Sequence, residues 1–125
     1  MMYSICLKRV YEQPEKSDGF RVLVDRLWPR GIKKEDLPYD LWDKSVTPSN
    51  ELRKWVHESP DTRWAEFTEK YQAQLDESPL TAQFVETLKK HPVITFLYAS
   101  KNEKQNHAQI LASYVKKMLT MQQFF

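Results

Sequence analysis

The sequence predicts an α/β fold: a small parallel sheet of about three strands, flanked by helices in a three-layer arrangement. Three apolar runs have the composition of buried strands, at residues 4–10, 20–25 and 93–99. A long stretch with helical periodicity separates the last two runs, and another follows the third. Because strands joined through helices are parallel, we expect helices on both faces of the sheet.

Length and composition favour one domain spanning residues 1–125, with a frayed tail at residues 120–125. A hydrophobic content of 41% argues against disorder. The single cysteine, Cys6, excludes an internal disulfide and a multi-cysteine zinc site. His57 and His91 lack partners at metal-ligand spacing, so we expect no metal.

The chain shows no nucleotide-phosphate loop, no dinucleotide glycine fingerprint and no nucleophile-elbow serine, so no cofactor is expected. No segment has the apolar length of a membrane span, and the N-terminus lacks a signal-peptide pattern. The sequence therefore predicts a cytoplasmic protein with no membrane partner.

The strands are delimited by turn-forming residues. The first run ends in a polar stretch that Gly19 closes, and the second cannot continue past Pro29, which lacks the N–H that a ladder needs. The third run is apolar on both alternating sets except at Thr95, which is typical of a strand covered on both faces. A fourth strand would have to come from residues 11–18 or 41–45, whose patterns are weak; residues 41–42 are expected to begin a short helix or irregular segment.

Three repeated dipeptides mark helix starts: Thr47-Pro48, Ser59-Pro60 and Ser78-Pro79. A serine or threonine cap accepts a hydrogen bond from a free backbone donor, and proline fits the first helical position. The third helix is expected to stop at Pro92. The last helix is predicted over residues 106–119.

Polar side chains follow the second and third strands at the point where each ends. The second strand leads into Asp25-Arg26-Leu27-Trp28-Pro29-Arg30-Gly31. Residues 21–34 hold five basic side chains and one acid, which favours an anionic ligand. If the two strands are neighbours, both loops line one crevice beyond their carboxyl ends.

The candidate site follows from that placement. Asp25 and His107 are the candidates for catalytic acid–base work. The candidate ligand-binding residues offer guanidinium, ammonium, aromatic and amide groups: Arg26, Trp28, Arg30, Arg53, Tyr98, Lys101 and Asn106. The alternatives are structural: Asp25 pairs only with the arginines, His107 only caps or packs against its helix, and the tryptophans belong to the core.

At these motifs the chain resembles the YeaO-like branch of a large bacterial family of unknown function. The resemblance covers Tyr3 to about Leu119 and is carried by Lys8-Arg9-Val10-Tyr11, the Asp-Arg-Leu-Trp-Pro-Arg-Gly string, Pro48-Ser49, Leu52-Arg53-Lys54-Trp55, Leu97-Tyr98-Ala99 and Asn106-His107-Ala108. Other branches carry cysteines where this chain has Tyr98 and Asn106, so it implies no cysteine-based chemistry here. It implies an α/β fold and a shared site, and no established activity.

Three functions are compatible with these features. The leading hypothesis is an enzyme acting on a phosphorylated or nucleotide-like anionic ligand at the carboxyl ends of the strands. The alternative is a non-catalytic module that binds a small anion or a nucleic acid. A third is a structural partner protein whose tryptophans form an interface. Turnover would separate the first two, and a steep salt dependence would indicate nucleic acid.

Overall fold

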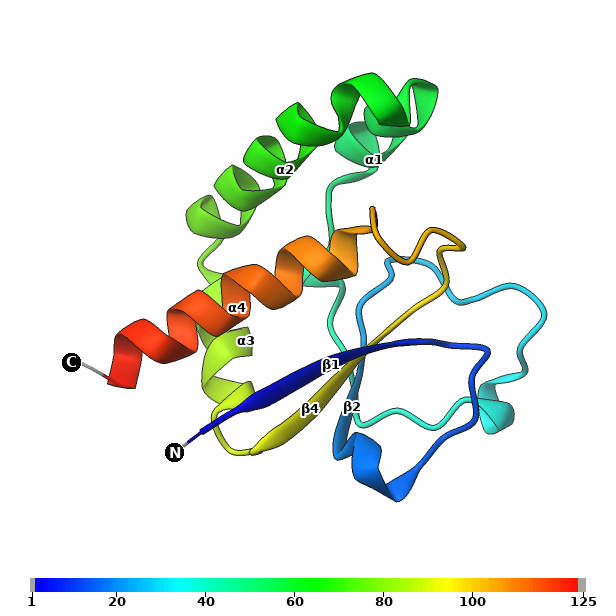
Figure 1. Cartoon of the computed structure of the whole chain (residues 1–125), viewed down its shortest axis with the longest axis vertical. Coiled ribbons are helices and arrows are strands. Elements are labelled where there is room, and N and C mark those ends of the chain that lie inside the picture. The colour runs from blue at the N-terminus through cyan, green and yellow to red at the C-terminus, as the bar shows by residue number, and fades with distance from the viewer. Residues whose placement is uncertain (1, 124–125) are drawn as a thin grey trace.

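The protein is an α/β fold built on a four-stranded parallel sheet, as seen in a computed structural model that describes residues 2–123 (Figure 1). The strands lie in the order β1-β4-β2-β3. Their bounds are β1 Ser4–Arg9, β2 Phe20–Leu23, β3 Leu41–Trp42 and β4 Val93–Tyr98. The α-helices are α1 Asn50–Glu58, α2 Pro60–Glu77, α3 Leu80–Leu88 and α4 His107–Gln123.

Strand β4 lies between β1 and β2, so the second and third apolar runs are neighbours, which is the condition on which a single crevice depends. The register pairs Leu23 of β2 with Leu97 of β4. The backbone N–H of Val24 then donates to the carbonyl oxygen of Leu97 over 3.0 Å. Because both strands run in the same direction, their carboxyl ends open on the same edge of the sheet, and Asp25 lies beside Ala99 there.

The fourth strand is a correction to the expected count of three. Residues Leu41 and Trp42 pair with β2 as a two-residue edge strand, where a short helix or irregular segment was expected. The backbone N–H of Asp40 donates to Arg21 O over 2.7 Å, and Arg21 N–H donates back to the Asp40 carboxylate over 2.8 Å. A two-residue strand is too short to show an alternating pattern, so these long-range bonds define it.

The three serine– or threonine–proline signals predicted helix starts to within two residues, and α3 begins at Leu80, one residue after the start that Ser78-Pro79 predicts. Ser59-Pro60 begins α2 with proline in its first turn, as predicted. The helix expected with Thr47 as its cap and Pro48 as its first residue begins two residues later, at Asn50, because Ser49 is the cap and accepts a hydrogen bond from Leu52 N–H. Thr47 instead donates its hydroxyl to Lys44 O over 2.7 Å.

All four α-helices lie on one side of the sheet, so the third layer differs from the expectation of helices on both faces. Under the helices, Ile5, Val22, Ile94 and Phe96 join one core cluster with residues of every α-helix. On the opposite face, Leu23 and Leu97 pack with residues of the irregular segment 24–40, such as Leu37 and Trp28. Figure 1 shows this segment lying away from the helices. The layers are therefore helices, sheet and loop.

An ion network is buried on the loop-covered face. Asp18 accepts hydrogen bonds from Lys8 Nζ over 2.9 Å and from the Arg21 guanidinium, and its backbone carbonyl accepts the Thr95 hydroxyl over 2.7 Å. Thr95 is the single polar break in the third apolar run. This contact explains why that break is tolerated in a central strand, since the hydroxyl is satisfied.

The C-terminal helix extends beyond its predicted end. Helix α4 continues to Gln123, so residues 120–123 are helical where a frayed tail was expected, and the rest of that expected tail lies outside the described residues. Leu119 is buried, which anchors this end of the helix. None of the described helices has the length and apolar character that a membrane crossing requires.

Candidate functional site

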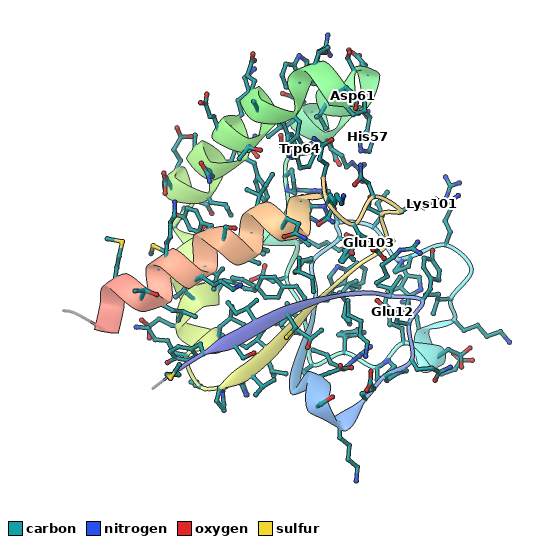
Figure 2. All side chains as sticks on the ribbon, viewed as in Figure 1. Glu12, His57, Asp61, Trp64, Lys101 and Glu103 are labelled. Carbon is teal, nitrogen blue, oxygen red and sulfur yellow. The ribbon has the colours of Figure 1, made fainter. Side chains whose placement is uncertain are left out.

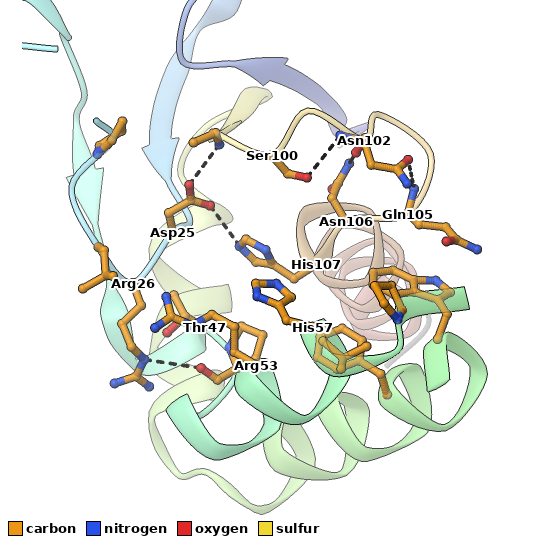
Figure 3. Close-up of a pocket in the computed structure, with 18 of the residues that line it drawn as sticks. Asp25, Arg26, Thr47, Arg53, His57, Ser100, Asn102, Gln105, Asn106 and His107 are labelled. Atoms are coloured by element: carbon orange, nitrogen blue, oxygen red, sulfur yellow. Dashed lines mark hydrogen bonds and ion pairs between the residues drawn. The ribbon is translucent and has the colours of Figure 1, made fainter. Parts of the chain in front are cut away.

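A cavity of about 630 Å³ lies beyond the carboxyl ends of β2 and β4, under the helical hairpin of α1 and α2 (Figure 3). Its walls come from the loop after β2, the segment before α1, the α1–α2 hairpin, and the loop leading into α4. Seven of the nine predicted site residues line it: Asp25, Arg26, Trp28, Arg30, Arg53, Asn106 and His107. The volume is in the range of cavities that hold small organic ligands.

Asp25 and His107 meet at the base of this cavity. The Nε2 atom of His107 lies 2.7 Å from the carbonyl oxygen of Val24 and 3.2 Å from Oδ1 of Asp25. Because a carbonyl oxygen can only accept, Nε2 carries the hydrogen. The other Asp25 oxygen, Oδ2, accepts the backbone N–H of Ala99 over 2.9 Å. The carboxylate thus joins the ends of both strands to the first residue of α4.

The three arginines of the cavity are not the partners of Asp25. Arg26 Nε donates to the carbonyl oxygen of Pro48 over 3.3 Å, and Arg53 Nη2 donates to Asn50 Oδ1 over 3.3 Å. Arg30 is exposed. Within residues 2–123, none of the three guanidinium groups forms an ion pair with a carboxylate. The alternative in which Asp25 merely neutralises these arginines is therefore wrong.

Asn106 lines the cavity but acts as the cap of α4. Its Oδ1 accepts the backbone N–H of Gln109 over 3.0 Å, and its Nδ2 donates to the carbonyl oxygen of Asn102 over 2.9 Å. The side chain is buried with both polar groups in use. Asn106 therefore shapes the cavity wall and orients the helix that carries His107.

Trp28 also reaches the cavity wall, yet its ring belongs to the loop layer. Its Nε1–H donates to the carbonyl oxygen of Ile32 over 2.7 Å. The ring stands edge-on to Tyr39 and Trp42, with centroid separations of 6.0 and 5.5 Å. These contacts fix the tryptophan in the packing of the loop over the sheet.

Two predicted site residues, Tyr98 and Lys101, do not line the cavity. Tyr98 lies on the helix-covered face of β4 and is 4% exposed. Burial raises the pKa of its hydroxyl above the ordinary value of 10.0, and Glu103 and Glu12 act in the same direction. Lys101 is exposed on the loop between β4 and α4 (Figure 2). Alternation along β4 explains the first placement, because Tyr98 shares a face with Phe96.

The amino-acid sequence matches a known protein family. Residues 4–124 match the family model described as "Inactive DUF488-N3 subclade", DUF488-N3i. The chain belongs to this family. It is 48% identical to the uncharacterised protein YeaO of Escherichia coli strain K12 over 115 residues, covering 92% of this chain and 99% of that protein. It is also 43% identical over 104 residues to the uncharacterised protein Rv3073c of Mycobacterium tuberculosis strain H37Rv, covering 83% of this chain and 86% of that one. No solved structure matches the chain.

The α1–α2 hairpin of this DUF488-N3i chain contributes side chains that the sequence did not single out for the site. His57, Asp61 and Trp64 line the cavity from above the start of α4 (Figure 2). Arg53 and His57 are four residues apart on α1, so they share one helical face. That spacing was the available signal. It was missed because the strand ends, rather than the helices, were expected to carry the chemistry.

The two histidines of the cavity come from different helices. His57 comes from α1 and His107 from α4, and both line the cavity (Figure 3). Across the described part of the chain, no group of three or more His, Cys, Asp or Glu side chains is arranged to hold a metal ion. The cavity therefore combines guanidinium, imidazole and carboxylate groups with an apolar wall.

Proposed function

We propose that this cavity binds a small phosphate-bearing ligand and that the protein acts as a non-catalytic binding module. The observation that carries the proposal is the set of three arginines, Arg26, Arg30 and Arg53, which line one cavity and whose guanidinium groups have no carboxylate partner among residues 2–123. A guanidinium group offers a planar pair of donors that matches two oxygens of a phosphate.

The charge balance of the cavity supports an anionic ligand. Three arginines stand against two carboxylates, those of Asp25 and Asp61. The Asp25 carboxylate accepts the backbone N–H of Ala99 and contacts His107, and only 16% of its side chain is exposed. An anion entering the cavity therefore meets mainly positive groups in a partly desolvated setting, where charge-assisted hydrogen bonds are stronger than in water.

The shape supports a small ligand over a nucleic acid strand. The cationic groups line a concave cavity of about 630 Å³ rather than an extended stripe. The description of the family as inactive supports binding without turnover. Acid–base catalysis on the same ligand is the second candidate, favoured by the contact between Asp25 and His107.

The test is calorimetric titration with inorganic pyrophosphate, comparing the natural chain with Arg53→Gln and Arg26→Gln. Each substitution removes one charge-assisted contact of about 1.5–3 kcal/mol and should weaken binding roughly tenfold to a hundredfold. Lys101→Gln is the matched control: it removes one positive charge from the β4–α4 loop, outside the cavity, and should leave the affinity nearly unchanged. Equal losses in all three variants would indicate general surface attraction and reject the cavity as the site.

Incubation of the natural chain with nucleoside and sugar phosphates, followed by phosphorus NMR, separates the two candidates. An unchanged spectrum with saturable binding is the expected result for a binding module. A new phosphorus resonance that disappears in His107→Asn would favour catalysis.

A further inference from the structure

The four tryptophans of this chain occupy different environments, and only one of them is placed to meet a ligand ring. The indole N–H groups of Trp28 and Trp42 donate to main-chain carbonyls over 2.7 Å each. Trp55 does not line the cavity, and its ring is covered by the cations of Arg63 and Lys70, at 4.8 and 4.4 Å.

Trp64 differs from the other three. It alone combines two features: it lines the cavity, from α2, and its Nε1–H donates to no acceptor within residues 2–123. Its ring lies against Phe67, with the centroids 5.0 Å apart, so the protein supports one side of the indole. The N–H of a buried indole usually finds a hydrogen-bond partner.

We infer that the phosphate-bearing ligand also carries a planar aromatic base, which stacks on Trp64, so that the ligand class is a nucleoside monophosphate. This inference rests on the proposed function. Part of the cavity wall is apolar and is formed by Val56, Pro60, Trp64 and Phe67. A bare phosphate or a sugar phosphate has no apolar group that could contact this wall. A base offers an aromatic face to Trp64 while its phosphate reaches the arginines.

The arrangement of the cavity fits such a two-ended ligand. Trp64 and Asp61 come from α2 (Figure 2), whereas Arg26 comes from the loop after β2 (Figure 3). The cavity therefore offers Arg26 and Arg30 from the loop after β2, Arg53 from α1 and Trp64 from α2 to one ligand. A volume of about 630 Å³ accommodates a ligand of this size.

The experiment is calorimetric titration of the full chain with adenosine 5′-monophosphate and with ribose 5-phosphate. The second compound has a hydroxyl group in place of the base. Stacking on an aromatic side chain should make the nucleotide bind roughly tenfold or more tightly. Trp64→Leu should reduce this ratio to near one while the affinity for ribose 5-phosphate stays the same. Trp64→Phe should retain most of the ratio, and Trp55→Leu, outside the cavity, all of it.

The outcomes separate this inference from the function on which it rests. Equal binding of the two phosphates by the natural chain overturns the base-stacking inference and leaves anion binding intact. A ratio that survives in Trp64→Leu overturns the assignment of Trp64. Absence of binding by either compound and by pyrophosphate rejects the proposed function itself. Urea denaturation of each variant verifies its fold. If Trp64→Leu does not fold, Trp64→Gln, which also removes the aromatic ring, takes its place: it should bring the ratio near one, and a ratio that survives in it overturns the assignment of Trp64.

Discussion

Asp25 and His107 join the end of β2 to the start of α4, with 3.2 Å between Oδ1 and Nε2. The ring hydrogen on Nε2 is directed to the carbonyl oxygen of Val24, so Oδ1 faces a donor without receiving a full hydrogen bond. The neutral His107 ring is therefore held in the tautomer that carries its hydrogen on Nε2. Its other nitrogen, Nδ1, has no hydrogen-bond partner in the described part of the chain.

Replacing Asp25 with asparagine should destabilise the fold. The amide oxygen can still accept the Ala99 N–H, but its NH2 group then faces the Nε2–H of His107, donor against donor. We expect the free energy of unfolding in urea to fall by about 1–3 kcal/mol. Asp61→Asn, which changes an exposed carboxylate of the same cavity, is the control and should shift it by no more than about 0.5 kcal/mol. Similar losses in both variants would contradict the structural role of Asp25.

The two glycines offer a matched pair of backbone tests. Both have a positive φ, 64° at Gly19 and 78° at Gly31. A Cβ at Gly19 would lie 2.3 Å from the carbonyl oxygen of Val93, whereas one at Gly31 would meet nothing within 4 Å. Gly31→Ala should cost about 1–2 kcal/mol through its backbone angle, and Gly19→Ala roughly a further 1–3 kcal/mol through the clash. Thermal unfolding measures both, and equal losses would contradict this close approach.

The buried carboxylate of Asp18 should make the free energy of unfolding depend on pH in the acidic range. Burial raises the pKa of this group, but hydrogen bonds from the Glu15 amide, Lys8 and Arg21 outweigh that effect and hold the pKa below its ordinary value of 3.8. A depressed folded-state pKa contributes stability that is present above the unfolded value and lost as pH falls through the folded one.

Asp18→Asn should therefore be less stable than the natural chain at pH 7, and the difference should shrink as the pH falls below about 4. Urea titrations from pH 7 to pH 2 measure this. Asp36→Asn, an exposed carboxylate in the short 3-10 helix 34–36, is the control and should parallel the natural chain throughout. A difference for Asp18→Asn that is constant with pH would show that the carboxylate charge is not what stabilises the network.

The main elements of the fold were predictable because they are long and strongly patterned. Three apolar runs and the serine–proline signals located the long strands and helix α2 to within a few residues. Strand β3 was not predictable, since two residues carry no period and their pairing depends on Arg21 and Asp40. The loop layer was missed because irregular segments such as 24–40 have no periodicity, although they bury Leu37 and half-bury Trp28.

The site was predictable where it depends on strand ends and less so where it depends on helices. Parallel neighbours bring Asp25 to His107, as their positions after the strands imply. The side of the sheet on which Tyr98 lies follows from alternation and could have been worked out from Phe96, the core residue two positions before it. The position of Trp64 in the cavity wall could not have been predicted, because it depends on how the α1–α2 hairpin packs over α4. Short-range sequence patterns do not encode that packing.

The most direct test of the central claim is a crystal structure of the protein soaked with tungstate, a heavy oxyanion whose anomalous signal locates it without ambiguity. We expect a peak inside the cavity, within hydrogen-bond reach of the guanidinium groups of Arg26 and Arg53, and its loss in crystals of Arg53→Gln. Tungstate bound only outside the cavity at saturating concentration, with these two side chains unengaged, would contradict it.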